Sequence, residues 1–198
     1  MATAVTAPRK VNLYDPERLL TIADVAVLPS QLPSGPVQYE LNDGRLVVMA
    51  PPGADHGKSQ IRFGFELIRQ GVQPGHGEAY SETGVILRRN PDRLVGPDAA
   101  FIVTSRMPAR ISREGYLETV PDLVVEIRSK NDKPSEVEEK IEDYLRAGVR
   151  VVWVGDPEVM TVTEHRSKHS PRVFTADDTL IVEDVIPGFA MKVRDGFC

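Results

Sequence analysis

The stretch Pro121-Asp122-Leu123-Val124-Val125-Glu126-Ile127-Arg128-Ser129 combines a run of aliphatic residues with an acidic residue near its end. Side chains of a strand alternate between its two faces, so Asp122, Glu126 and Arg128 share one face. The run Leu123-Val124-Val125 and Ile127 are apolar, which is typical of a central strand that is covered on both sides. An ionised carboxylate in such a strand is costly unless a cation compensates it. The segment therefore predicts a buried strand, with Glu126 in either a functional site or a buried ion pair.

A second strand opens in the same way, with Pro97-Asp98-Ala99-Ala100-Phe101-Ile102-Val103. Taken alone, an Asp after Pro is more often a turn residue. Two carboxylates from adjacent strands, with a backbone carbonyl and waters, would make an oxygen-only site that suits magnesium or manganese. Asp122 lies roughly 13 Å from Glu126 along the strand, too far to share one metal. We therefore assign Asp122 to the start of the strand or to the rim of the site.

A positive charge beside these carboxylates has two candidates. Arg128 can clamp a phosphate but cannot act as a base. Lys140 lies on the following helix, at the border of its buried stripe, and could reach back over the strand ends. Its position alone favours a surface pair with Glu136, worth at most a few tenths of a kcal/mol. Glu40 is a candidate for a further acid near the metal, as a possible third ligand. His56 lies at a helix N-terminus, where a lone His is more often structural.

The N-terminal half predicts two helices, a hairpin and two strands. Residues 15–27 have helical character, and Asn42-Asp43-Gly44 is a strong turn signal within a hairpin over residues 37–49. We expect Asp55 to cap a helix that continues to Gln70. The strands are expected over residues 79–87 and 94–103. The face of the second helix that we expect to be buried carries Ile61, Phe65 and Ile68.

The C-terminal half predicts a helix, a strand and a series of short strands. Ser135 and Glu138 form a capping-box pattern, and Gly148 ends the helix. A buried strand follows over residues 149–154, and residues 160–193 resemble a meander at the edge of the sheet. The apolar stripe of this helix comprises Val137, Ile141, Tyr144 and Leu145.

This order predicts an α/β (α+β) fold, a mixed β-sheet flanked by helices, with an N-terminal hairpin and a C-terminal β-meander. The chain of 198 residues suits a mobile arm over residues 1–20 and a single domain over residues 21–198. No P-loop, dinucleotide fingerprint or G-x-S-x-G nucleophile motif occurs.

Composition bounds the function. The net charge of -5 argues against broad, nonspecific adhesion to nucleic acid, so any DNA-facing basic patch must be local. Cys198 is the only cysteine, which fits a reducing compartment. No signal peptide or membrane span is apparent, so we expect a cytoplasmic protein without a membrane partner.

Taken together, these segments resemble the Uma-two family of restriction endonuclease-like proteins over roughly residues 20–195. The order and spacing of the motifs carry the resemblance more than any one of them. The matching segments are Tyr39 to Leu46, Gly96-Pro97-Asp98, the strand from Pro121 to Ser129, Glu138 to Tyr144 with Gly148, Val152-Trp153-Val154, and Ile186-Pro187-Gly188-Phe189.

The resemblance implies a PD-(D/E)xK nuclease core, a divalent cation and hydrolysis of phosphodiester bonds. Asp98 matches the PD aspartate, and Glu126 matches the acid of the (D/E)xK strand. Lys140 matches a lysine that has moved from that strand to the following helix. Glu40 matches an acidic position in the hairpin, and His56 matches a frequent His before the first helix of the core.

The chain departs from the family pattern at two places. Arg128 stands two residues after Glu126, where the plain signature has Lys. Lys130-Asn131-Asp132 follows Ser129, where the family often has Pro-Ser. These departures leave the carboxylates intact and make the identity of the catalytic cation the open question.

The leading hypothesis is a magnesium-dependent DNA endonuclease, with manganese as the alternative metal. Asp98 and Glu126 would hold the metal, Lys140 would position the water or stabilise developing charge, and Arg128 would contact phosphate. A second hypothesis is a binding or assembly protein with an inactive nuclease fold, and a third is a metal phosphodiesterase acting on RNA or small molecules. A homodimer is plausible because restriction-type nucleases often cut two strands symmetrically.

Overall fold

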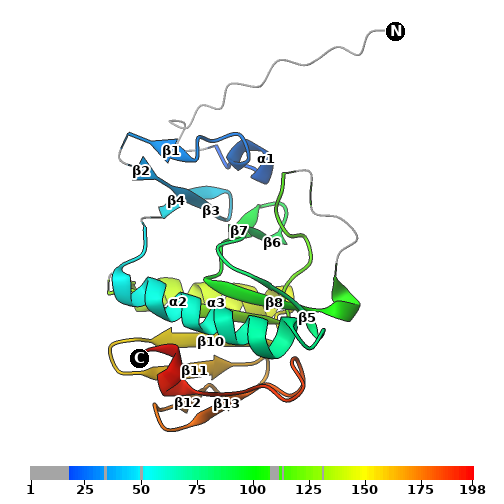
Figure 1. Ribbon diagram of the computed structural model, residues 1–198. Helices are drawn as coiled ribbons and strands as arrows, with labels where there is room; N and C mark the ends of the chain where they lie inside the picture. Colours follow the sequence, from blue (N-terminus) through cyan, green and yellow to red (C-terminus); the bar gives the residue numbers. More distant parts are fainter. Residues whose placement is uncertain (1–17, 34, 50, 108–111, 113, 131) are drawn as a thin grey trace.

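A six-stranded mixed sheet forms the centre of the protein (Figure 1). The computed structural model describes residues 18–33, 35–49, 51–107, 112, 114–130 and 132–198. Strands β9 and β10 run parallel, and the other neighbouring pairs are antiparallel. In spatial order the strands are β12 (Arg172–Phe174), β11 (Thr161–His165), β10 (Val151–Asp156), β9 (Leu123–Ile127), β8 (Ala99–Val103) and β5 (Gly77–Tyr80). The predicted mixed sheet flanked by helices is confirmed.

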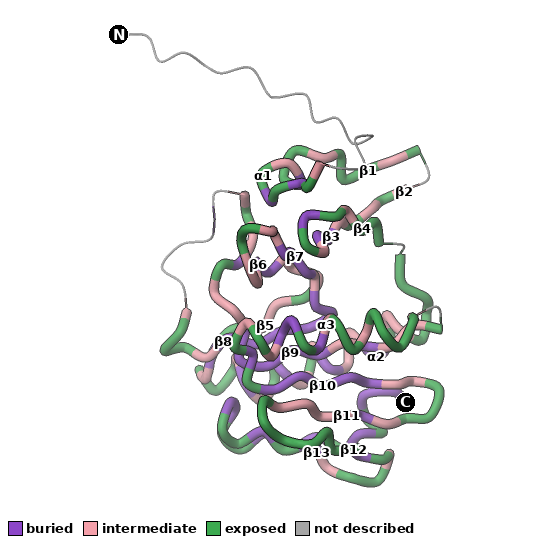
Figure 2. Tube along the Cα trace, turned by 180° about the vertical axis from the view of Figure 1, so that it is seen from behind, coloured by how far each residue is buried: buried purple, intermediate pink, exposed green. Residues whose placement is uncertain are grey.

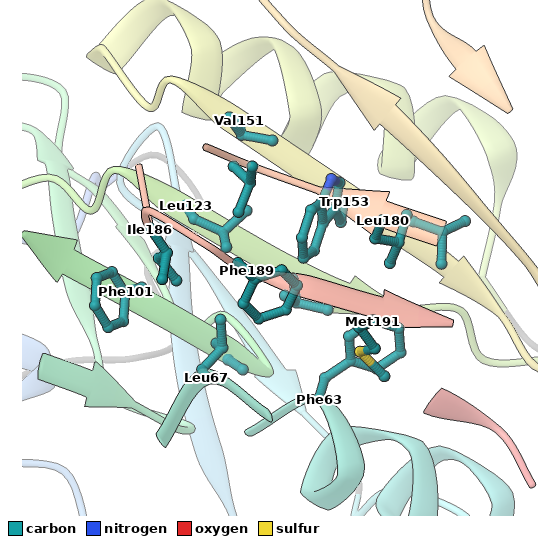
Figure 3. Packing of buried hydrophobic residues seen from close by; sticks show 14 of the residues in the cluster. Phe63, Leu67, Phe101, Leu123, Val151, Trp153, Leu180, Ile186, Phe189 and Met191 are labelled. Atoms are coloured by element: carbon teal, nitrogen blue, oxygen red, sulfur yellow. The ribbon is translucent and has the colours of Figure 1, made fainter. Parts of the chain in front are cut away.

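Strand β9 is covered on both faces, as its sequence predicted. Leu123 and Val125 pack into the hydrophobic cluster on the side of helix α2 (Ala54–Leu67), as Figure 3 shows for Leu123. Val124 points to the other side and packs against helix α3 (Pro134–Ala147). The middle of the sheet is accordingly buried along most of β8, β9 and β10 (Figure 2).

Helix α2 packs with a different face from the one predicted. Phe63 and Leu67, spaced by one turn, are buried against the sheet, and α2 continues as a π-helical turn over Ile68–Val72. The expected face is exposed instead and comprises Ile61, Phe65 and Ile68. The helix carries apolar residues on two faces. The face with Phe63 is the buried one, because the ring of Phe63 packs edge-on against the ring of Phe197, with 5.8 Å between the ring centroids. Gly53, rather than Asp55, is the N-cap residue.

Helix α3 connects β9 to β10 and begins one residue before the predicted capping box. Pro134 opens the helix and Lys133 is its N-cap, without a side-chain cap. Ser135 therefore lies inside the first turn, where its side chain cannot serve as a cap. Gly148 ends the helix in the left-handed conformation, with φ of 105°, as predicted.

A smaller four-stranded sheet lies beside the central one. Its order is β4-β3-β7-β6, and the predicted hairpin forms its β3 and β4, with Asp43 and Gly44 as a two-residue turn. Helix α1 (Ile22–Val25) and the strand pair β1 (Gln31–Leu32) and β2 (Gly35–Pro36) precede it. The strands are β3 (Gln38–Asn42), β4 (Arg45–Met49), β6 (Val85–Arg88) and β7 (Arg93–Val95).

Two predicted strands are wrong in the same way, because each is divided between the two sheets. Residues 79–87 separate into β5 and β6, and the break includes Glu82 with φ of 55°. Residues 94–103 separate into β7 and β8 at Gly96-Pro97-Asp98, where Pro97 has no N–H for a sheet ladder. The chain thus crosses from one sheet to the other at both points, and the second crossing carries Asp98.

The predicted C-terminal meander lies only partly at the sheet edge. Strands β11 and β12 extend the edge, but β13 (Thr179–Ile181) and β14 (Ala190–Lys192) form a separate antiparallel pair. Leu180, Phe189 and Met191 pack into the same cluster as Phe63 (Figure 3), so burial of apolar side chains draws this segment over the sheet face. A 3₁₀ turn, η3 (Val193–Gly196), follows it.

The N-terminal expectations fall partly outside the described residues. Within residues 15–27, α1 covers four residues, and residues 1–17 of the expected arm are not described. The expectation of one domain over residues 21–198 stays a prediction. In the described part of the chain, no helix is both long and apolar enough to cross a membrane.

Candidate active site

A large cleft opens between the two sheets. Its volume is about 1230 Å³, and its walls come from the hairpin, the N-terminus of α2, the ends of β9 and β10, and the N-terminal half of α3. The carboxyl ends of parallel strands, here β9 and β10, are where sheet proteins commonly place ligands. The cleft lining includes the candidate residues Glu40, His56, Asp98, Glu126, Arg128 and Lys140.

The two candidate carboxylates lie side by side. Ala99 pairs with Val125 across the antiparallel strands, so the next residues outward, Asp98 and Glu126, are neighbours. The Oδ2 atom of Asp98 also accepts a hydrogen bond from the backbone N–H of Ile127 at 2.6 Å. Their side chains are 11% and 17% exposed, respectively. The structure thus brings together two carboxylates from chain segments that lie far apart in sequence.

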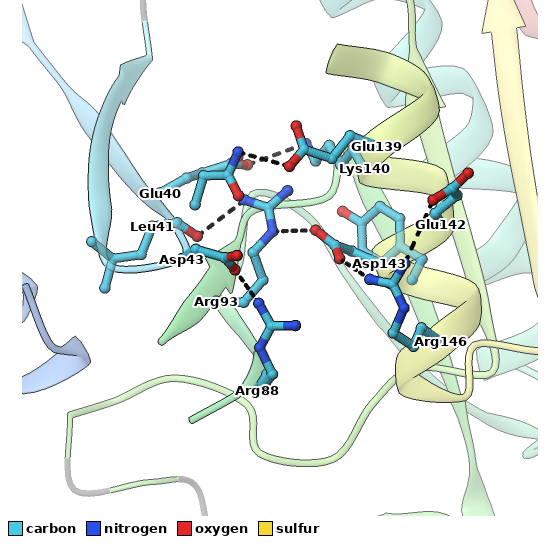
Figure 4. Close-up of polar contacts among 12 residues, drawn as sticks. Glu40, Leu41, Asp43, Arg88, Arg93, Glu139, Lys140, Glu142, Asp143 and Arg146 are labelled. Carbon is cyan, nitrogen blue, oxygen red and sulfur yellow. Dashed lines mark hydrogen bonds and ion pairs between the residues drawn. The ribbon is translucent and has the colours of Figure 1, made fainter. Parts of the chain in front are cut away.

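Lys140 joins these carboxylates from helix α3. Its Nζ lies 3.1 Å from Oε1 of Glu40 (Figure 4). The same Nζ lies 3.0 Å from Oε1 of Glu126. The alternative surface pair does not form, since Glu136 pairs with Lys133 at 2.7 Å. Lys140 therefore reaches back over the strand end, with its side chain only 18% exposed.

Glu40 reaches the site from the small sheet. Besides contacting Lys140, its Oε1 accepts a hydrogen bond from the N–H of Gly96 at 2.8 Å. Gly96 belongs to the same crossing as Asp98, so Glu40 ties the hairpin both to the carboxylate segment and to α3. The site therefore depends on how the two sheets are held together.

Tyr144 is a site residue that the sequence analysis assigned only to the apolar stripe. Its side chain is fully buried, and its hydroxyl donates a hydrogen bond to Oε1 of Glu126 at 2.5 Å. Tyr144 lies one helical turn after Lys140, so both side chains project from the same face of α3. That spacing is the signal that could have revealed it.

Burial and these contacts shift the pKa values of Glu126, Lys140 and Tyr144. Burial raises the pKa of Glu126 to about 7, and the charges of Asp98 and Glu40 add to this effect against the opposing influence of Lys140 and Tyr144. For Lys140, burial lowers the pKa, but the surrounding carboxylates outweigh it, so its pKa is raised. Burial also raises the pKa of Tyr144, which remains a hydrogen-bond donor at neutral pH. The pKa of Glu126 therefore lies near neutrality.

His56 contacts the cluster from the first turn of α2. Its Nε2 lies 3.2 Å from Oδ2 of Asp98, and this hydrogen bond raises the pKa of the imidazole against the opposing effect of burial. Its Nδ1 is buried and has no hydrogen-bond partner among the residues that the structure describes. A buried ring nitrogen without a partner is suited to a bound water or ligand atom.

Arg128 and Asp122 have different surroundings. Arg128 lines the cleft, where it pairs with Asp156 at 3.1 Å and keeps 40% of its side chain exposed. Asp122 is fully buried at the opposite end of β9, where it accepts hydrogen bonds from Arg106 and the N–H of Val103. The structure does not bring Asp122 to the cleft, and its partners explain its burial without a functional role.

The carboxylates fit a divalent cation with few protein ligands. Among the described residues, no three Asp, Glu, His or Cys side chains lie together at metal-ligand spacing. Lys140 occupies the space between Glu40 and Glu126, which leaves Asp98 and Glu126 as the adjacent pair. Magnesium is commonly held by one or two carboxylates and several waters, so this pair suits it.

The mixed sheet flanked by helices carries two adjacent carboxylates at the end of a central strand, and a lysine from helix α3 reaches them. This combination is typical of a nuclease-like fold. The same fold occurs in the crystal structure of "a putative nuclease belonging to DUF820 from Anabaena variabilis ATCC 29413", with a TM-score of 0.74 and 21% identity. The match covers 90% of this chain and 97% of that one. The chain belongs to the Uma2 family, described as "Putative restriction endonuclease", whose model matches residues 28–194. A comparison with curated proteins finds no match.

Proposed function

We propose that this protein is a magnesium-dependent endonuclease that hydrolyses phosphodiester bonds in DNA, with manganese as an alternative metal. The observation that carries the proposal is the meeting of Asp98, Glu126 and Lys140 at the end of β9, inside an open cleft. Membership of a restriction endonuclease-like family supports the class of reaction.

Each residue has a distinct part in this proposal. Asp98 and Glu126 would hold the metal, which when bound would supply an activated water and stabilise charge on a phosphoryl oxygen. Lys140 would orient the attacking water with its ammonium and stabilise negative charge that develops on the phosphate. Arg128 would contact a phosphate by exchanging its partner Asp156.

Tyr144 and His56 act through the carboxylates. The Tyr144 hydroxyl fixes one oxygen of Glu126, so that this side chain keeps a single orientation. His56 similarly contacts one oxygen of Asp98. Both are positioning residues, because their contacts in the structure are with the carboxylates.

The charge of the cleft supports a need for metal. Ten acidic side chains line it, against four Lys and Arg side chains. A phosphate backbone would be repelled by this lining unless cations were bound there. Metal binding would therefore serve substrate binding as well as hydrolysis.

The same acidic lining favours a second candidate, a binding or assembly protein that keeps the nuclease fold without activity. A metal phosphodiesterase acting on RNA or small molecules would use the same residues, and substrate choice alone separates it from a DNA nuclease. We place the reaction in the cytoplasm because the single cysteine fits a reducing compartment.

The test is cleavage of supercoiled plasmid, linear duplex DNA, single-stranded DNA and RNA with magnesium or manganese. We expect wild type to cleave DNA, and Glu126→Gln and Asp98→Asn to lose at least about 100-fold in rate. Glu142→Gln is the matched control, because Glu142 lies on the same helix as Lys140 with its side chain 72% exposed. Metal binding measured by calorimetry, together with equal cleavage by wild type and Glu126→Gln, would contradict the catalytic assignment. Absence of both metal binding and cleavage would favour the inactive binding protein.

A further inference from the structure

Helix α2 carries an apolar face that no part of the described chain covers. Ile61, Phe65 and Ile68 are 71%, 58% and 46% exposed, respectively. Their spacing of four and three residues places them in one continuous stripe. A contiguous apolar stripe of this kind on a protein surface commonly marks an interface.

The surroundings of the stripe are open. A Cβ atom added at Gly57 or at Gly64, which flank the stripe on one side, would meet no atom within 4 Å. Figure 1 shows α2 in front of the central sheet, with its length across the surface of the molecule. A second helix could therefore approach the α2 backbone closely along this side.

The opposite edge of the stripe carries a row of charges. At 3.6 residues per turn, Asp55, Lys58, Arg62, Glu66 and Arg69 follow one another along this edge. Apart from the central Arg62, the charges of this row are opposite to those of the same row read in reverse. With Arg62 at the centre, Asp55 lies opposite Arg69, and Lys58 lies opposite Glu66.

We propose that the stripe Ile61, Phe65 and Ile68 is the interface of a homodimer in which two α2 helices pack antiparallel about a two-fold axis. In that arrangement each charged row lies against its own copy in the opposite direction. The pairs that exist within one helix, Lys58 with Asp55 and Arg69 with Glu66, then meet opposite charges of the partner helix. The central Arg62 meets itself, but its guanidinium already donates to the carbonyl oxygen of Asp195 at 3.3 Å, away from the axis. A parallel pair would place the charged row against Gln60 and Gly64, where no charge lies.

The arrangement has a consequence for the clefts. His56 lies in the first turn of α2, six residues before Arg62, so the two copies of His56 lie about 18 Å apart along the helix direction. Each dimer therefore carries two separate clefts at opposite ends of the paired helices. The proposal stands on α2 alone and does not depend on the proposed nuclease function.

Sedimentation of the full chain tests the interface. We expect wild type to be a dimer at micromolar concentration, and Phe65→Glu to raise the dissociation constant at least about 30-fold. Val173→Glu is the control, because Val173 is 61% exposed on β12, the strand at the far edge of the sheet from β8 and β5. Circular dichroism and thermal unfolding of Phe65→Glu should match wild type at a concentration where both are monomeric. A monomeric wild type, or a dimer that Phe65→Glu leaves intact, overturns the proposal.

Cysteine cross-linking tests the direction of the helices, in a Cys198→Ser background because Cys198 is exposed. We expect an equimolar mixture of Lys58→Cys and Glu66→Cys proteins to form a mixed disulfide at least about tenfold faster than either protein cross-links to itself. Cross-linking of each protein to itself that is as fast as the mixed reaction would overturn the antiparallel arrangement.

Discussion

The hydroxyl of Tyr144 donates a hydrogen bond of 2.5 Å to the same Glu126 oxygen that lies 3.0 Å from the ammonium of Lys140. One face of α3 therefore supplies both a neutral donor and a positive charge to a carboxylate on the adjacent strand. The two contacts oppose the effect of burial on Glu126, and each can be removed separately.

Removing the Tyr144 hydroxyl should raise the pKa of Glu126 further. In Tyr144→Phe the ionised carboxylate loses a donor, so metal binding and cleavage should shift to higher pH. The free energy of unfolding should fall by about 1–2 kcal/mol. The measurements are the pH profile of cleavage and urea unfolding, with Tyr80→Phe as control because Tyr80 does not line the cleft. An unchanged pH profile would show that the hydroxyl does not act on Glu126.

Removing the Lys140 ammonium should leave Glu40 and Glu126 without their shared counter-charge. Lys140→Met should lower the free energy of unfolding of the metal-free protein by about 2 kcal/mol, which is less than the about 3–5 kcal/mol for a fully buried pair because Lys140 is 18% exposed. Magnesium should raise the melting temperature of this variant more than that of wild type, since a cation can replace the ammonium.

Cleavage by Lys140→Met should fall about 100-fold or more, measured with saturating metal. Lys133→Met is the control, because Lys133 pairs with Glu136 on the surface and its side chain is 73% exposed. Full activity in Lys140→Met would indicate that Arg128, rather than Lys140, supplies the positive charge that cleavage requires.

The raised pKa of Glu126 predicts that the free energy of unfolding of the metal-free protein falls as the pH rises. Its pKa is about 7 in the folded protein against an ordinary value of 4.5, so the folded state binds the proton more tightly. The resulting stabilisation is fully present below about pH 4.5 and is lost as the pH rises through about 7. Urea unfolding of the metal-free protein should show this loss between about pH 5 and about pH 8, and Glu126→Gln should show a smaller one.

Metal binding should follow the opposite trend, because a divalent cation binds the ionised carboxylate. The affinity for magnesium should rise with pH through about 7 and then level off. Calorimetry in buffers of different ionisation enthalpy should detect proton release at the lower pH. Binding without proton release at about pH 6 would show that Glu126 is already ionised in the metal-free protein.

The buried pair of Arg93 and Asp143 fastens the small sheet to α3 (Figure 4). Their charged atoms lie 2.6 Å apart, and Arg93 also donates to the carbonyl oxygen of Leu41 at 3.0 Å. Asp143→Ala should lower the free energy of unfolding by about 3–5 kcal/mol, because it leaves Arg93 buried without a counter-charge. The double variant Arg93→Met/Asp143→Leu should recover most of this loss. Chemical unfolding measures both, and a double variant no more stable than the single one would contradict the explanation.

Several parts of the fold could be predicted because a local pattern decides them. The apolar run of β9 requires cover on both faces, and the Asp43-Gly44 turn fixes the hairpin. The face of α2 could not be predicted, since both of its faces are apolar and distant packing of Phe63 against Phe197 selects one. The division of two strands between the sheets was missed because each half has ordinary strand character.

The candidate site could likewise be predicted only in part from the sequence. Burial of a charge in a central strand singled out Glu126 from its own sequence, whereas Asp98 depended on the family resemblance until the strand register placed it beside Glu126. Helix position alone argued for Lys140 on the surface, because the partner that holds it, Glu40, comes from another sheet. The contact of Tyr144 with Glu126 could not be predicted, because a tyrosine in an apolar stripe is expected to be buried like any apolar side chain.

The placement of Lys140 on α3 makes the number of residues between Pro134, where the helix begins, and Lys140 part of the proposed catalytic apparatus. One residue inserted there would move Lys140 by about 100° around the helix axis. Lys140 and Tyr144 would then turn away from Glu126 together, although no residue of the site had been exchanged. Relatives that differ in the length of this segment should therefore carry their lysine at a correspondingly shifted helical position.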